Sequence, residues 1–450
     1  MRRSTMRAAA SPAATAGAGS RGQRRAGERR SSRVVTAALV VGAIVAAGAV
    51  GVAPGSSAVA ATTPPAGSPS STSGPSATPT RPGWPSPTPS ASTAPSEPGR
   101  LRAAFPALSA EERIRAYAEV RLNSMTLEQK IASMFMVHVA GSDPAALQGY
   151  LEANKPGGLL LLGDNVPGSA ADAAALTGAL HESDGLATLI AIDQEGGIVA
   201  RLRDDGYAAA DTLKSEPVQA TTDAFTQRAA LLDATGMTVN FGIVADVTSD
   251  PSSFIFERSL GADPSSASAR VAAAVSAERG SVVSTLKHFP GHGAAGGDSH
   301  TSIPTTDLGY EQWLAEDAPP FQAGVDAGAE MVMFGHLVYS SVDGAPASLS
   351  PEWHRVLRDE LGFDGVAVTD DLLMLENSGV AAYADRTTNA IAAVAAGNDL
   401  LLYNSTVDVP ALSAAIASAV RAGTIPESRI DEAALRLLDL RRTLWVAGDR

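Results

Sequence analysis

The stretch VVSTLKHFPGHGAAGGDSHTSIP, residues 282–304, joins an apolar run to a glycine-rich segment and contains three of the chain's seven histidines. The run, residues 282–289, lacks the polar alternation of a strand with one solvated face, so it indicates a strand buried on both faces, as in a parallel sheet. We expect this strand to end at Leu286, so that Lys287 and His288 point into the mouth formed where the strands end. The stretch therefore predicts a buried strand followed by a loop with reactive side chains.

The same unit recurs along residues 101–450, where each apolar run is followed by a turn and an alanine-rich stretch of helical spacing. Eight such units in about 350 residues predict an α/β fold, a (β/α)₈ TIM-type barrel. A doubly wound open sheet is the alternative, but no glycine pattern for a dinucleotide or nucleotide phosphate follows the first run. The eight runs are residues 132–139, 157–162, 187–193, 238–243, 282–289, 330–336, 365–370 and 398–403.

Polar side chains stand at the ends of four of these runs. A barrel of this kind carries its catalytic groups where strands end, on the carboxyl face. Ordinary turn chemistry explains one such strand end, but four together predict an active site around one mouth. The residues are Asp193 in DQEGG, Lys287 with His288, His336, and Asp370 with Asp371.

The glycine-rich loop, residues 290–300, follows the fifth run. Its glycines predict a mobile loop whose backbone can approach a ligand closely. Asp298 and His300 are two residues apart, so the carboxylate can hydrogen-bond the imidazole and fix its tautomer. Imidazole exchanges protons near neutral pH, and the pair is therefore a candidate for proton transfer.

A metal site is the competing interpretation of this loop, with His288, His292 and His300 as ligands. The spacing H-x₃-H places two imidazoles together on a helix, which Pro290 and its neighbouring glycines disfavour. Lys287 beside the first histidine would repel a cation. We expect neither a metal nor a cofactor, and His292 can equally be a structural hydrogen-bonding residue.

Residues 1–60 have the pattern of an export signal. Nine arginines precede residue 34, residues 34–53 carry no charge, and Ala58 and Ala60 fit a small-x-small cleavage site. The alternative is an uncleaved anchor that associates with a membrane through residues 34–53. Residues 61–100 are rich in Pro, Ser and Thr and predict a disordered linker. We therefore expect a secreted or cell-envelope protein outside the cytoplasm.

The charge of the chain is divided unevenly. Residues 1–100 hold eleven arginines and two glutamates, so the chain's net charge of −14 leaves −23 for residues 101–450. An acidic globular part has no electrostatic footprint for nucleic acid, and we expect no such partner. The chain has no cysteine, which excludes disulfides and lipid-modified cysteines.

Four strings extend the argument to a known family. In order and spacing they resemble the family 3 glycoside hydrolases, and specifically the single-barrel bacterial β-N-acetylglucosaminidase branch. The resemblance covers residues 125–444. The strings are MTLEQKIASMFMV (125–137), AIDQEGGIVARL (191–202), LKHFPGHGAAGGDSH (286–300) and LGFDGVAVTDDLLM (361–374).

The resemblance implies roles for individual residues. It makes Asp370 the nucleophile, His300 the acid/base and Asp298 the partner of that histidine. Retaining glycosidases need a carboxylate that attacks the anomeric carbon and a second group that protonates the leaving oxygen. Asp371 is expected to cap a strand end or start a helix. The residues implied to hold the sugar are Asp193, Arg201, Arg258, Lys287 and His288, and we expect cationic Lys287 and Arg258 to keep Asp370 ionised.

The expected function is a retaining exo-acting β-N-acetylglucosaminidase. Its substrate would be a terminal, non-reducing β-linked N-acetylglucosamine on muropeptide or chitin fragments. Ile198 stands where the family often has arginine, and Phe334 and Gly335 where other residues are frequent, so the outer subsites are expected to differ. The alternatives are a phosphorylase or β-glucosidase of the same family, or a non-catalytic wall-binding barrel.

Overall fold

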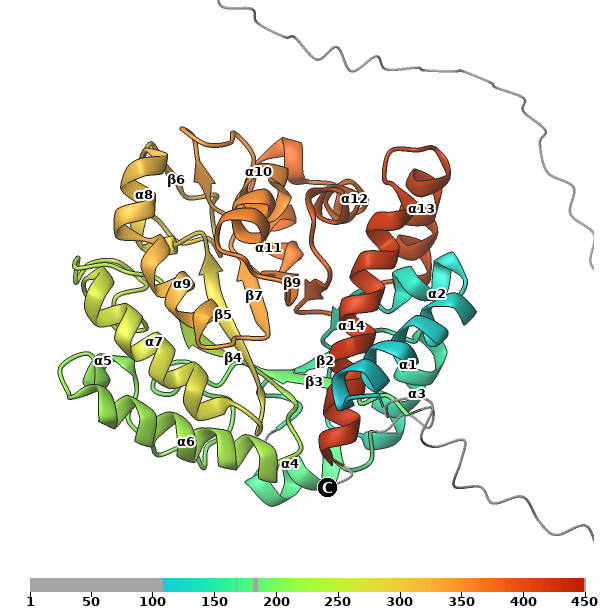
Figure 1. The fold of residues 1–450 in the computed structure, drawn as a ribbon, viewed down its shortest axis with the longest axis horizontal. Coiled ribbons are helices and arrows are strands. Elements are labelled where there is room, and N and C mark those ends of the chain that lie inside the picture. Colours follow the sequence, from blue (N-terminus) through green and yellow to red (C-terminus); the bar gives the residue numbers. More distant parts are fainter. Residues whose placement is uncertain (1–107, 167, 181–184, 449–450) are drawn as a thin grey trace, which may run out of the picture. The chain divides into compact units, whose positions relative to one another are not determined.

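The computed structural model describes residues 108–166, 168–180 and 185–448. The predicted export signal (1–60) and linker (61–100) lie outside the described residues. Within the described part, no helix is both long and apolar enough to cross a membrane. Figure 1 shows the helices of this part arranged around a central set of strands.

Eight parallel strands form one sheet, and each coincides with one of the predicted apolar runs, although β4 extends one residue beyond its run. Neighbouring strands are hydrogen-bonded in the order β10-β1-β2-β3-β4-β5-β7-β9, and a bridge between Val368 and Leu400 joins the two ends. The sheet therefore curls into a near-barrel that fits the predicted TIM type. The strands are β1 (Phe135–Val137), β2 (Gly158–Leu161), β3 (Leu189–Ile192), β4 (Val239–Val244), β5 (Val283–Phe289), β7 (Met331–Phe334), β9 (Val366–Thr369) and β10 (Leu401–Tyr403).

All residues of these eight strands are buried, as expected for strands packed inside a ring of helices. A separate pair, β6 (Thr305–Thr306) and β8 (Val338–Tyr339), lies outside the barrel sheet. The helices are α1 (Ala110–Ser124), α2 (Leu127–Ala132), α3 (Pro144–Asn154), α4 (Ala170–Thr177), α5 (Ala210–Leu213), α6 (Val218–Ala234), α7 (Pro264–Glu278), α8 (Tyr310–Glu316), α9 (Ala318–Asp326), α10 (Pro351–Arg355), α11 (Leu372–Asn377), α12 (Arg386–Ala396), α13 (Val409–Arg421) and α14 (Glu427–Gly448), with short turns of other helix types at His292–Ala294, Ala347–Leu349, Val356–Glu360 and Ala381–Tyr383.

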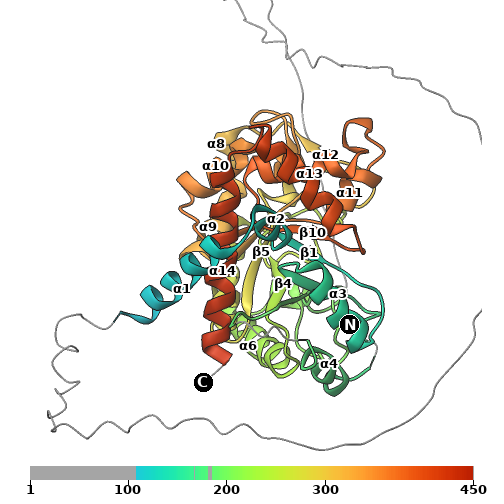
Figure 2. The ribbon, with the colours of Figure 1, turned by 90° about the vertical axis from the view of Figure 1, so that its right-hand side faces the viewer.

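The helix ends follow from local sequence. Aspartate side chains at positions 143, 263 and 408 accept hydrogen bonds from the first turns of α3, α7 and α13, and each is followed within two residues by proline. Both features stabilise a helix start. The first and last helices, α1 and α14, lie side by side, where Ala118 and Leu122 pack against Leu438 (Figure 2).

Strand β5 corrects one prediction. It continues through Lys287 and His288 to Phe289, so the predicted end at Leu286 is wrong. Lys287 is in register with Val244 of β4 and only 2% exposed. A lysine can remain inside the sheet here because acidic side chains neutralise its ammonium group, as described below.

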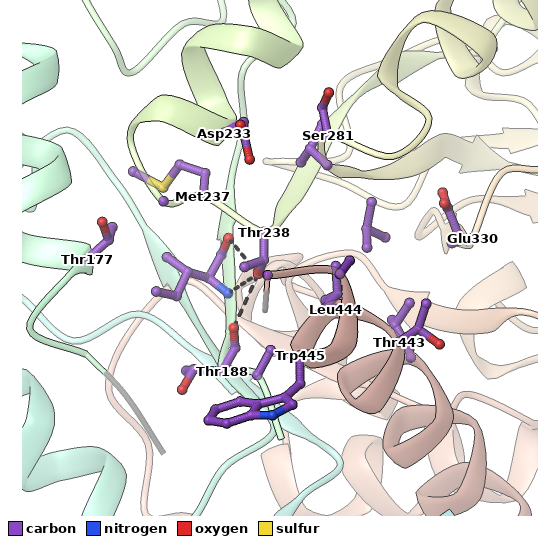
Figure 3. Close-up of a pocket in the computed structure, with 18 of the residues that line it drawn as sticks. Thr177, Thr188, Asp233, Met237, Thr238, Ser281, Glu330, Thr443, Leu444 and Trp445 are labelled. Atoms are coloured by element: carbon purple, nitrogen blue, oxygen red, sulfur yellow. Dashed lines mark hydrogen bonds between the residues drawn. The ribbon is translucent and has the colours of Figure 1, made fainter. Parts of the chain in front are cut away.

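A cavity of about 540 Å³ lies at the amino ends of the strands (Figure 3). Its wall includes Thr188 and Thr238, at the starts of β3 and β4, and Leu444 and Trp445 of α14. The predicted catalytic groups stand at the carboxyl ends of the strands. The cavity of about 540 Å³ is therefore at the opposite end of the barrel from the predicted catalytic groups.

Candidate active site

Five charged side chains form the floor of the barrel mouth, which we call the ion-pair floor. Lys287 Nζ lies 3.0 Å from Asp193 Oδ1 and 2.6 Å from Glu195 Oε1. Glu195 also accepts hydrogen bonds of 2.9 and 2.7 Å from the Arg258 guanidinium. Arg201 Nη2 lies 3.4 Å from Asp193 Oδ2. The loop after β3 and the end of β5 thus meet through ion pairs.

These ion pairs keep the floor charged despite its burial. Burial raises the pKa of Asp193 and of Glu195, but the Lys287 ammonium and the nearby guanidinium groups outweigh it and hold both pKa values below their usual range. Burial lowers the pKa of Lys287, and the two carboxylates reverse that shift. The floor therefore offers fixed charged donors and acceptors to a polar ligand.

His288 is held by a buried carboxylate beneath it. Asp246 follows β4 and is fully buried, and its Oδ2 lies 2.7 Å from His288 Nδ1. The same carboxylate accepts the backbone N–H groups of His288 and, at 2.6 Å, of His292. Arg258 Nη2 lies 3.4 Å from His288 Nε2. These partners fix the imidazole with its Nδ1–H toward Asp246.

Asp370 follows β9 and faces the same mouth. Burial raises the pKa of this carboxyl, but the His288 and His336 imidazoles and the backbone N–H of Asp371 outweigh it and hold the pKa below its usual range. The N–H of Asp371 donates to Asp370 Oδ1 at 2.8 Å. Lys287 contributes less than the imidazoles, and Arg258 is engaged with Glu195. The imidazoles, which our sequence argument did not consider, are thus the main source of this stabilisation.

The neighbouring Asp371 has a structural environment. Its side chain accepts the N–H groups of Leu373, in the first turn of α11, and of Asn404, each at 3.1 Å. Burial raises its pKa to about 6. His336, predicted at the mouth, lies behind this strand end: it is buried, with Nδ1 2.7 Å from Ser348 Oγ and Nε2 donating to the carbonyl of Asp371. Asp371 therefore starts a helix, as predicted, and His336 supports the strand end.

The base of the glycine-rich loop is anchored to the barrel. Trp313 Nε1 donates to the carbonyl of Pro290 at 2.8 Å, and Tyr339 OH donates to that of Gly291 at 2.6 Å. Gly291 has a φ of 134°, which favours glycine. A Cβ at Gly293 would stand 1.7 Å from a backbone oxygen of the β4–α7 loop. This part of the loop requires glycine for close contact.

The tip of the same loop is exposed. Asp298 Oδ1 lies 2.6 Å from His300 Nδ1 and also accepts the His300 backbone N–H at 3.0 Å. The two side chains are 44% and 63% exposed. The carboxylate orients the imidazole so that Nδ1–H points to Asp298 and Nε2 is left for another partner. This arrangement suits a group that exchanges a proton with a ligand.

His292 lies between the buried and the exposed parts of the loop. It is 1% exposed, and neither ring nitrogen has a hydrogen-bond partner among the residues that the structure describes. Burial lowers its pKa to about 4, so the ring is neutral at neutral pH. Of the two interpretations left open for His292, the structural one applies to its backbone N–H, which donates to Asp246, and not to its ring.

One cavity of about 140 Å³ collects most of the predicted site residues. Asp298 is outside its lining and is linked to it through His300. Met333, Met374 and Leu402 add an apolar wall, and Asn404 a polar one. The predicted residues that line the cavity are Asp193, Arg201, Arg258, Lys287, His288, His300 and Asp370.

Three residues of the site received no role in the sequence argument. Glu195 belongs to the quoted DQEGG string, and Asp246 follows the fourth apolar run after only three residues. Asp193 was singled out because it is a carboxylate at the end of an apolar run, and Asp246 stands close to the end of the next run. Asn404 follows the last run in the same way.

A metal would need a cluster of ligating side chains. Among the residues that the structure describes, no three His, Asp or Glu side chains are grouped so that they could hold a metal ion. His288 and His292 have ring centroids 6.1 Å apart, and the Nδ1 of His288 is committed to Asp246. The metal-site interpretation with His288, His292 and His300 as ligands therefore finds no support among the described residues.

Comparison with known families agrees with this geometry. Residues 126–440 match the family model described as the Glycosyl hydrolase family 3 N terminal domain. The chain belongs to glycoside hydrolase family 3. The family assignment confirms the resemblance of the four sequence strings, and the match includes every predicted site residue.

Individual relatives agree with the family assignment. This family 3 chain is 33% identical over 331 residues to beta-hexosaminidase LpqI of Mycobacterium tuberculosis, covering 69% of this chain and 82% of the relative. The solved structure of M. tuberculosis LpqI superposes with a TM-score of 0.64 at 31% identity, over 72% of this chain and 96% of the other. A family 3 beta-N-acetylglucosaminidase from Paenibacillus gives a TM-score of 0.66 at 32% identity, over 71% of this chain and 63%, just under two thirds, of that chain.

Proposed function

We propose that this family 3 enzyme is a retaining β-N-acetylglucosaminidase that removes terminal, non-reducing β-linked N-acetylglucosamine. The observation that carries the proposal is the Asp298–His300 pair at the edge of a cavity that also contains Asp370. The relatives named beta-hexosaminidase and beta-N-acetylglucosaminidase support the choice of sugar. The ion-pair floor supplies charged partners for sugar hydroxyls and for an N-acetyl group.

The first half of the reaction forms a glycosyl-enzyme. The ionised carboxylate of Asp370 attacks the anomeric carbon, and the bond from this carbon to the leaving oxygen breaks. His300, with both ring nitrogens protonated, donates its Nε2 proton to that oxygen. Asp298 stabilises the imidazolium through Nδ1–H, as its short hydrogen bond allows. The products are a glycosyl ester of Asp370 and a neutral His300.

The second half releases the sugar. Neutral His300 accepts a proton from water at Nε2, and the water oxygen bonds to the anomeric carbon while the ester bond breaks. Asp370 leaves as a carboxylate, which the surrounding imidazoles and the Asp371 N–H stabilise. Two inversions at one carbon give overall retention. The cycle balances with no metal or cofactor.

Phosphorolysis is a second candidate for the second half. A histidine acid/base repels an incoming phosphate less than a carboxylate would. Phosphate would then attack the glycosyl ester and yield a sugar 1-phosphate. Measuring turnover with and without phosphate, with analysis for the sugar 1-phosphate, separates the two reactions.

A direct test of the function uses two chromogenic substrates. Nitrophenyl β-N-acetylglucosaminide should be hydrolysed at least 100-fold more efficiently than nitrophenyl β-glucoside, with the β-anomer of the sugar as the first product. Preference for the glucoside would favour a β-glucosidase. No hydrolysis of either would favour a non-catalytic wall-binding barrel. Activity that is lost in EDTA and restored by zinc would favour a metal site.

The biological setting follows from the amino-terminal sequence. An export signal or anchor in residues 1–60 and a linker in 61–100 would present a catalytic domain, residues 101–450, outside the cytoplasmic membrane. Muropeptides and chitin fragments are the N-acetylglucosaminides expected there. Cell fractionation with amino-terminal sequencing of the mature protein tests this location: cleavage near Ala60 is expected, and a cytoplasmic, intact chain would contradict it.

A further inference from the structure

Phe254 is the one described residue lining the 140 Å³ cavity that carries a benzene ring. It stands in the loop between β4 and α7 and is half-buried. Its ring centroid lies 4.6 Å from that of His292 and 6.5 Å from that of His300. The catalytic scheme above gives this side chain no role.

The position of Phe254 follows from the geometry of acid catalysis. An acid must come within hydrogen-bond reach of the leaving oxygen, and this oxygen is the first atom of the departing sugar. The group beside His300 therefore meets the sugar that leaves, whereas the ion-pair floor meets the sugar that is retained. Phe254 lies beside His300, and its ring makes edge contacts with both histidines of the loop.

We propose that Phe254 is the platform on which the departing sugar stacks, so that it forms a leaving-group subsite for a second pyranose. A pyranose presents axial C–H groups on its faces, and an aromatic ring provides a rigid apolar surface for them. This inference rests on the proposed glycosidase activity. If it is correct, the enzyme prefers a disaccharide to a substrate with a small leaving group because of Phe254, which takes no part in the chemical steps.

A purely structural role is the main rival, because Phe254 also packs against the buried ring of His292. If that packing positions the loop, losing the phenyl ring should impair His300 with every substrate. N-acetylglucosaminyl fluoride distinguishes the two roles, because its leaving group is fluoride and not a sugar. Loss of a sugar platform should not affect its turnover. Loss of the loop's position should lower its kcat, because His300 must still act as the base that activates water.

Phe256 is a matched control two residues along the same loop. It is half-buried like Phe254, but its ring lies under Lys214 Nζ at 3.9 Å and does not line the cavity. The variants to compare in the full-length enzyme are Phe254→Leu, Phe254→Trp and Phe256→Leu. The substrates are N,N′-diacetylchitobiose and N-acetylglucosaminyl fluoride.

Phe254→Leu should lower kcat/KM for the disaccharide about tenfold, the range of one good aromatic contact, and lower kcat for the fluoride less than about threefold. Phe254→Trp should restore the disaccharide value to within about twofold of wild type. Phe256→Leu should change both by less than about twofold. These outcomes together support the subsite.

Equal losses on both substrates for Phe254→Leu would overturn the subsite and make Phe254 a positioning residue for the loop. No loss on either substrate would overturn it as well. Wild-type enzyme that cleaves neither substrate would instead contradict the proposed function itself, and the subsite would fall with it. Loss of folding is checked by the melting temperature of each variant.

Discussion

The mouth contains two aspartate–histidine pairs of nearly equal geometry in opposite surroundings. Asp246 and His288 are joined at 2.7 Å and buried, whereas Asp298 and His300 are joined at 2.6 Å and largely exposed. In both, the carboxylate holds Nδ1. The buried pair is immobilised by further contacts to Arg258 and to backbone N–H groups.

The difference in burial indicates that the two histidines have different roles. A buried histidine with both nitrogens engaged cannot give up a proton without breaking its own contacts, so it suits binding and orientation. An exposed histidine whose Nε2 has no partner in the described part of the chain can exchange a proton with the leaving group and with water. Burial, more than the type of residue, distinguishes the two roles.

The largest loss of activity is expected on substitution of the nucleophile, Asp370, near which both pairs lie. Asp370→Ala should lower kcat at least about 10⁴-fold, because no glycosyl-enzyme can form. Asp371→Ala is the matched control. It should keep a substantial fraction of the activity and lose about 1 kcal/mol of stability, because it removes the cap of α11. Steady-state kinetics and thermal melts measure both. Equal loss of activity in the two variants would contradict the assignment of Asp370.

Substitution of the exposed histidine comes next. His300→Ala should lower kcat/KM for a disaccharide roughly 10²- to 10⁴-fold, the usual worth of general acid catalysis, and much less for a nitrophenyl glycoside, which leaves without a proton. Stopped-flow absorbance should show a burst of nitrophenol followed by a slow rate that azide partly restores. An equal loss on both substrates with no burst would mean that His300 acts in binding only.

Matched substitutions of the two carboxylates separate the pairs directly. Asp298→Asn should lower kcat about tenfold and leave the melting temperature within about 2 °C, because the pair is exposed. Asp246→Asn should cost about 2–4 kcal/mol of stability, because Asp246 is a buried charge that accepts several N–H groups. Kinetics and denaturation of both variants measure the contrast. Equal stability losses would contradict the division between the pairs.

The smallest effect is expected at Asp317, which packs against Gly291 at the base of the loop. Burial raises its pKa from 3.8 to about 8, with the Asp246 carboxylate adding to the shift. A raised pKa in the folded state contributes stability at low pH that is lost between about pH 4 and pH 8. Asp317→Asn should therefore raise the melting temperature by about 3 °C or more at pH 8 and change it little at pH 4. An equal shift at both pH values would contradict the buried, protonated state.

The fold could be predicted from the sequence because strands of a buried parallel sheet consist of nearly continuous apolar residues. Each of the eight runs corresponds to one strand, and the polar residues at the strand ends identified the mouth. The exact end of β5 was not accessible. Lys287 remains in the strand because Asp193 and Glu195, almost a hundred residues earlier in the chain, neutralise it, and local sequence does not show such partners.

The sequence predicted the candidate site in part, as it did the fold. Short-range relations such as the Asp298–His300 contact follow from spacing alone. Long-range ones do not: the imidazoles that stabilise the Asp370 carboxylate and the Asp246 support of His288 depend on which strands become neighbours. The orphan ring nitrogens of His292 likewise depend on packing against Phe254, which no spacing rule predicts.

The most direct test of the account is to find where the sugar is bound when His300 is removed. His300→Ala should react with nitrophenyl β-N-acetylglucosaminide and then stall, because no base activates water. Acid quenching, pepsin digestion and mass spectrometry should then show one N-acetylhexosamine on the peptide containing residues 366–374, with fragmentation placing it on Asp370. A sugar on Asp371, or unmodified protein despite slow turnover, would contradict a glycosyl-enzyme at Asp370 that depends on His300 for its release.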